Sequence, residues 1–138
     1  MAGLVPGCSR VRPLSRRLLE TLVTHLGCLR SEVMLELPFG EDGRLIGQVV
    51  CTAGGVAAIR AACRPLLRRT QACGATGLLL VHNHPSGDPR PSRADVIATR
   101  GLSMLCRSAR IEFYDHLVIG GRRALSMRRA DLMNREVA

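Results

Sequence analysis

The sequence lacks lysine and tryptophan, and it contains only one tyrosine and two phenylalanines. All twenty of its basic residues are therefore arginine, and with eleven acidic residues they give a net charge of +9. Such a charge is typical of proteins that bind nucleic acids. However, the arginines lie in scattered pairs, and few aromatic rings are available to stack on bases. We therefore favour a compositional bias as the origin of the charge and keep nucleic-acid binding as the alternative.

Two further absences concern cysteine spacing and long apolar runs. None of the six cysteines forms a Cys-x-x-Cys pair, which disfavours a zinc site built from thiolates. No apolar run approaches the ~18 residues of a membrane-spanning helix, and the N-terminus lacks the apolar core of a signal peptide. We predict a cytoplasmic protein with reduced cysteines and no association with membranes.

Helices are predicted from apolar residues that recur every three to four positions. This pattern gives one helix over residues 13–26 and another that begins at Ser92. Proline is tolerated in the first turn of a helix but not deeper, so Pro65 predicts a helix that begins near Arg64 and ends at Cys73. A short helix over residues 128–135 closes the chain.

Strands are predicted where apolar and polar residues alternate or where a short apolar run is bounded by turn residues. Residues 32–37 alternate, which indicates a half-buried strand that pairs with residues 45–51 in a hairpin. Residues 78–81 are all apolar and should form the centre of the sheet. Residues 111–119 and 123–127 form a second hairpin around a Gly-Gly turn.

This order of elements predicts the fold class. A chain of 138 residues can bury the core of one domain. We predict a loose tail over residues 1–12 and a single domain over residues 13–138. Helices that alternate with strands in this order indicate an α/β (α+β) domain, in which a mixed sheet is flanked by helices.

Two histidines follow directly on the apolar strand. In an extended chain residues i and i+2 point the same way, so the side chains of His82 and His84 share one space while Asn83 points away. Two imidazoles are common zinc ligands, and a third protein ligand leaves the fourth position for water. Asp95 is the nearest carboxylate on an ordered element, because Asp88 lies in a Gly-Asp-Pro turn.

Each half of this pattern also has an ordinary explanation. Ser92 followed by Asp95 resembles a capping box, which begins many helices that have no function. A lone His-x-His occurs in ordinary turns, and His116 is best explained as a hydrogen-bonded histidine of the sheet. The combination of a strand-end His-x-His, seven residues and Ser-x-x-Asp at a helix start is much rarer, and a capping serine can still donate a hydrogen bond into the site.

The string His-Asn-His-Pro-Ser-Gly-Asp-Pro at residues 82–89, followed by Ser92 and Asp95, resembles the JAMM motif of JAB/MPN domains. It is similar to the RadC-like branch in particular, and the resemblance covers roughly residues 14–130. It implies a cytidine-deaminase-like α/β core and a zinc-dependent hydrolase, which in related JAMM members is a metalloprotease or isopeptidase.

The resemblance also implies a part for each site residue. His82, His84 and Asp95 would hold zinc, Ser92 would steady the water or the oxyanion, and Glu32 would be the general base. Residue patterns alone do not select Glu32, because Glu36 lies on the same face of the same strand.

Three functions follow from these observations. The first is a zinc metallohydrolase that cleaves peptide or isopeptide bonds. The second is a DNA-repair-associated protein that binds nucleic acids, or a metal-dependent nuclease, although such nucleases favour carboxylate clusters over histidines. The third is a domain whose metal is structural and which acts by contact alone.

Overall fold

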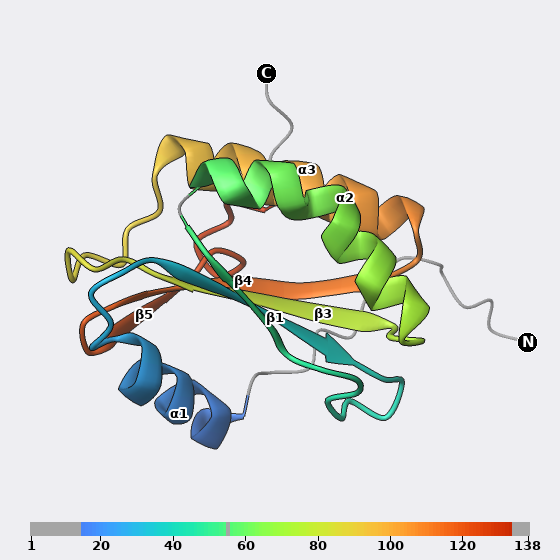
Figure 1. Cartoon of the computed structure of the whole chain (residues 1–138), viewed down its shortest axis with the longest axis horizontal. Helices are drawn as coiled ribbons and strands as arrows, with labels where there is room; N and C mark the ends of the chain where they lie inside the picture. The colour runs from blue at the N-terminus through green and yellow to red at the C-terminus, as the bar shows by residue number, and fades with distance from the viewer. Residues whose placement is uncertain (1–14, 55, 134–138) are drawn as a thin grey trace, which may run out of the picture.

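The computed structural model describes residues 15–54 and 56–133, so the predicted tail at 1–12 lies outside the described residues (Figure 1). The described elements are, in chain order, α1 (Arg16–Leu26), β1 (Val33–Phe39), β2 (Val50–Ala53), α2 (Val56–Ala72), β3 (Gly77–Asn83), α3 (Arg93–Ser108), β4 (Glu112–Gly120) and β5 (Arg123–Ser126). Among them, no helix is both long and apolar enough to cross a membrane.

The strands form one mixed sheet in the order β2-β1-β3-β4-β5. β3 is parallel to β4, and the other neighbouring strands are antiparallel. Figure 1 shows α2 and α3 on one face of this sheet and α1 on the other. The predicted fold class, a mixed sheet flanked by helices, is confirmed.

The central strand β3 is apolar throughout because both of its faces are covered. Leu78 and Leu80 pack in the core beneath α2 and α3, whereas Leu79 and Val81 pack with residues of α1. All four side chains have an exposed fraction of 0%. The strand is therefore rigidly held, and it delivers the residues at its C-terminal end to a fixed position.

The strand predicted over residues 32–37 is present as β1, but the prediction that it is half-buried is wrong. A half-buried strand would leave alternate side chains in solvent, but Met34 and Glu36 are only 1% and 3% exposed. Met34 packs in the core beneath α2 and α3. Glu36 is buried because Arg69 of α2 neutralises its charge, with 2.6 Å between Arg69 Nη2 and Glu36 Oε1. β1 is thus covered on both faces.

The predicted start of α2 is also wrong, because the helix begins at Val56 and contains Pro65 in its interior. An interior proline removes a helix hydrogen bond and costs about 3 kcal/mol. Pro65 itself is exposed, and the next residue, Leu66, is 1% exposed in the core. Burial of this helix face offsets the local cost, so the helix continues through the proline.

Two smaller differences occur at loops. Residues 45–49 do not form a strand, apart from one bridge between Phe39 and Leu45. The short helix predicted from residue 128 is a series of turns as far as residue 131, and residues 134–135 lie outside the description. Arg128 ties this segment to β4, since its side chain donates to the carbonyls of Phe113 and Tyr114.

Candidate metal centre

The C-terminal end of β3 and the first turn of α3 meet at one point. His82 is in β3, and the backbone N–H of His84 donates to the carbonyl of Ile119 on the parallel strand β4, at 2.7 Å. Both histidines are thereby fixed by the central strands of the sheet. Ligand sites of open α/β sheets lie at such carboxyl ends.

The start of α3 is fixed by the predicted capping box. The Asp95 N–H donates to Ser92 Oγ at 3.0 Å, and the Ser92 N–H donates to Asp95 Oδ2 at 2.7 Å. Asp95 is fully buried, with an exposed fraction of 0%. Burial opposes its ionisation, but the contacts with the His82 ring and the Ser92 N–H outweigh this and hold the pKa of the Asp95 carboxyl below its ordinary value.

Possible ligand atoms of three residues converge in this space. His82 Nε2 and His84 Nε2 are 2.9 Å apart, Asp95 Oδ2 lies 3.2 Å from His84 Nε2, and Asp95 Oδ1 lies 3.5 Å from His82 Nε2. Ligands at zinc distances of 2.0–2.1 Å in a tetrahedron would be about 3.3–3.4 Å apart. Among the described residues, Asp95 Oδ1 has no hydrogen-bond partner. The spacing and the unpartnered oxygen both fit a bound cation.

The tautomer of His84 follows from its other nitrogen. His84 Nδ1 lies 2.9 Å from the carbonyl oxygen of Asp88. A carbonyl can only accept, so Nδ1 carries the proton and the lone pair of Nε2 faces the cluster. The Asp88 side chain turns instead to Arg90, whose hydrogen bonds lower the pKa of Asp88 to about 2. Asp88 therefore serves the cluster through its backbone alone.

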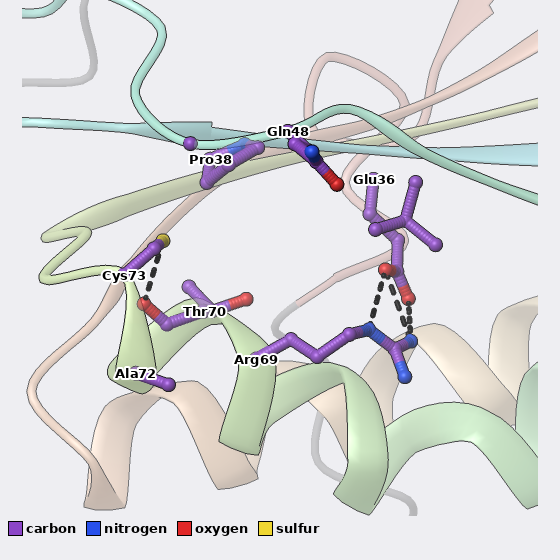
Figure 2. Close-up of a pocket in the computed structure, with 9 residues that line it drawn as sticks. Glu36, Pro38, Gln48, Arg69, Thr70, Ala72 and Cys73 are labelled. Atoms are coloured by element: carbon purple, nitrogen blue, oxygen red, sulfur yellow. Dashed lines mark hydrogen bonds and ion pairs between the residues drawn. The ribbon is translucent and has the colours of Figure 1, made fainter.

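The structure separates the two candidate bases, Glu32 and Glu36. Ligand atoms of Glu32, His82 and His84 all lie within 4.8 Å of one another. Glu36 instead binds Arg69 with both carboxylate oxygens, as Figure 2 shows. Glu32 is therefore the carboxylate of this strand region that lies at the histidines.

The middle residue of the His-Asn-His sequence, Asn83, fixes the position of Glu32. Asn83 Oδ1 accepts from the Val33 N–H at 2.7 Å, and Asn83 Nδ2 donates to the Ser31 carbonyl at 3.0 Å. These contacts hold the residues on both sides of Glu32. The sequence showed only that Asn83 points away from the histidines, because its partners lie 50 and 52 residues earlier.

Two more residues, His116 and Thr99, extend the cluster, although the sequence did not place either of them there. His116 Nε2 lies 2.6 Å from His82 Nδ1, and Thr99 Oγ1 lies 2.6 Å from His116 Nδ1. Burial holds the pKa of His116 well below its usual range. His116 is a hydrogen-bonded histidine of the sheet, as predicted, but its partner is a histidine of the cluster. The one available signal was the position of Thr99, four residues after Asp95 on the same helix face.

Comparisons with known proteins identify a family and several relatives with similar sequences. Residues 14–132 match the family model described as the RadC-like JAB domain. A UPF0758 protein of Clostridium perfringens is 31% identical over 114 residues, which cover 83% of this chain and 50% of that protein. One from Streptococcus suis is also 31% identical, over 83% of this chain and 46% of its own length. One from Rhodobacter capsulatus is 43% identical over 70 residues, which are 51% of this chain and 33% of that protein. The chain thus spans about half the length, or less, of these relatives.

Proposed function

Since the chain belongs to the RadC-like JAB domain family, we propose that it is a zinc-dependent hydrolase that cleaves peptide or isopeptide bonds. The observation that carries this proposal is the convergence of His82 Nε2, His84 Nε2 and the Asp95 carboxylate within 3.5 Å of one another. Two imidazoles and one carboxylate suit zinc, whereas magnesium and calcium prefer oxygen ligands.

Glu32 and Ser92 are the proposed reactive groups of the chain itself. Zinc in such a site supplies a water whose pKa falls to about 7. The Glu32 carboxylate accepts a proton from the attacking water and passes it to the nitrogen of the leaving amine. Ser92 Oγ already accepts from the Asp95 N–H, so its own proton can be donated to the substrate carbonyl oxygen.

Glu32 could instead be the third metal ligand, because it lies with both histidines within 4.8 Å. Asp95 is the better ligand for two reasons. It is fully buried, and its Oδ1 has no other partner among the described residues. Glu32 is only partly buried, so it can contact water and substrate.

Zinc content tests the proposal and shows whether Asp95 or Glu32 is the third metal ligand. Protein purified without added metal should contain about one zinc ion per chain. His84→Ala and Asp95→Asn should lose it, and Glu32→Gln should retain it while losing hydrolysis of peptide substrates. Metal-free protein whose melting temperature does not change on addition of zinc would exclude this function.

A second candidate function, nucleic-acid binding, is favoured by the position of the arginines. The sequence of α2 contains four arginines and no acidic residue. Arg64 and Arg68, one helical turn apart on α2, and Arg93 and Arg107 on α3 are exposed. Both helices cover the same face of the sheet (Figure 1). Four exposed arginines from two helices thus lie on one face of the sheet.

Salt dependence tests this second candidate. Binding of duplex or single-stranded DNA should weaken steeply as salt rises, because each phosphate contact releases counterions. Arg64→Gln with Arg68→Gln should weaken binding, whereas Arg16→Gln with Arg17→Gln, on α1 across the sheet, should not. No binding at ~50 mM salt would exclude it.

A further inference from the structure

We propose that Thr99 and His116 are positioning residues that hold His82 in the tautomer required of a metal ligand, with its proton on Nδ1 and its lone pair on Nε2. The inference rests on the proposed metal site. It concerns residues that the proposed function leaves unused: His116 lies in β4, on the far side of His82 from Asp95, and Thr99 lies in α3. We call this chain of contacts the Thr99–His116 relay.

The relay begins at a backbone carbonyl. Thr99 Oγ1 lies 2.7 Å from the carbonyl oxygen of Asp95, one helical turn earlier. Since the carbonyl can only accept, the threonine hydroxyl donates its single proton there, as threonines within helices often do. With that proton committed, Thr99 Oγ1 can only accept from His116.

The direction of each following hydrogen bond is then determined. His116 Nδ1, 2.6 Å from Thr99 Oγ1, must carry the proton, and a neutral imidazole has only one. His116 Nε2 is therefore an acceptor for His82 Nδ1, which lies 2.6 Å away and carries the proton of that ring. His82 is left with a lone pair on Nε2, the atom that faces His84 and Asp95.

Burial makes this order of protons stable. Thr99 and His116 are 0% exposed and His82 is 3% exposed, so water does not compete for these atoms. Reversal of any one hydrogen bond would bring two lone pairs or two protons together, which is costly in a buried network. The relay also joins both sources of ligands, because it begins at the carbonyl of Asp95 and ends at the ring of His82.

A buried threonine elsewhere provides a matched control. Thr70 of α2 is 4% exposed, and its hydroxyl donates to the Leu66 carbonyl at 2.9 Å, one turn earlier, as Thr99 does to Asp95. Its hydrogen bonds in the described structure involve none of the histidines. Thr70→Val therefore reports the general effect of replacing such a hydroxyl with a methyl group.

The test measures zinc affinity by competition with a chromogenic chelator. Thr99→Val should weaken zinc binding about 10- to 100-fold, the usual effect of removing a group that orients a ligand histidine. Thr99→Ser should restore the affinity, and Thr70→Val should leave it unchanged. Thr99→Val that folds and binds zinc like the wild type would overturn the relay alone, whereas a wild type that binds no zinc would overturn the metal site and the relay together.

Nuclear magnetic resonance of the histidine rings tests the same inference in the wild-type protein. This test remains available if the Thr99→Val variant fails to fold. Long-range correlations between ring protons and nitrogens identify which nitrogen is protonated. The relay requires Nδ1-protonated rings for both His82 and His116. An Nε2-protonated His116 would overturn it.

Discussion

Asn83 holds the segment around the proposed base, Glu32, against the histidine segment, so its replacement should release this segment and destabilise the protein. Asn83 is 1% exposed and makes two hydrogen bonds, with the Val33 N–H and the Ser31 carbonyl. Asn83→Ala removes both. A neutral hydrogen bond contributes about 0.5–1.5 kcal/mol net, and a buried group left without a partner costs about 1–3 kcal/mol. Since Ser31 is exposed, water can reach its carbonyl. We therefore expect a loss of about 2–3 kcal/mol in the free energy of unfolding.

Urea denaturation measures this loss. The control is Gln48→Ala, which removes a side-chain amide from an exposed residue of the loop between β1 and β2 and should change stability by less than about 0.5 kcal/mol. An Asn83→Ala protein as stable as the Gln48→Ala protein would refute the argument that Asn83 anchors the segment around Glu32.

Three further predictions concern neighbouring features. Glu36→Gln should lower the free energy of unfolding in urea by about 1–2 kcal/mol, because it breaks the ion pair of a buried carboxylate with Arg69. The loss is limited because water can partly reach Arg69, and the zinc content should not change. Gly120→Ala should weaken zinc binding, since a Cβ would lie 2.5 Å from the backbone of the loop that orients His84, whereas Gly101→Ala meets nothing within 4 Å and should be tolerated. Burial raises the pKa of Cys106 to about 12, so iodoacetamide at pH 8 should modify exposed Cys73 but leave Cys106 unmodified until the protein unfolds, as mass spectrometry would show.

The parts of the fold that could be predicted are those set by neighbouring residues. The apolar run of β3, the glycine after α1 and the capping box of α3 each carry a local signal, and the structure shows all three elements. The start of α2 could not be predicted in this way. The local preference of Pro65 was overridden by burial of Leu66 in a core that forms only when α2 packs on the sheet.

In the candidate site, too, the residues that are close in sequence could be predicted, whereas those brought together by packing could not. His82, His84, Ser92 and Asp95 lie within 14 residues of sequence, and their spacing suggested that they meet. The choice between Glu32 and Glu36 depended on Arg69, which is 33 residues from Glu36 and reaches it only through the packing of α2. The contact of His116 with His82 likewise required the register of β3 and β4.

The two hydrogen-bonded connections at this site imply that its parts move together. Asn83 links the histidine segment to the residues around Glu32, and the Thr99–His116 relay links Asp95 to His82. Each connection joins elements that are far apart in sequence but meet at one end of the sheet. A displacement of β1 or of α3 would therefore be passed to the histidines through buried hydrogen bonds. For this reason, metal affinity should respond to replacement of Thr99, a residue that is not itself a proposed ligand.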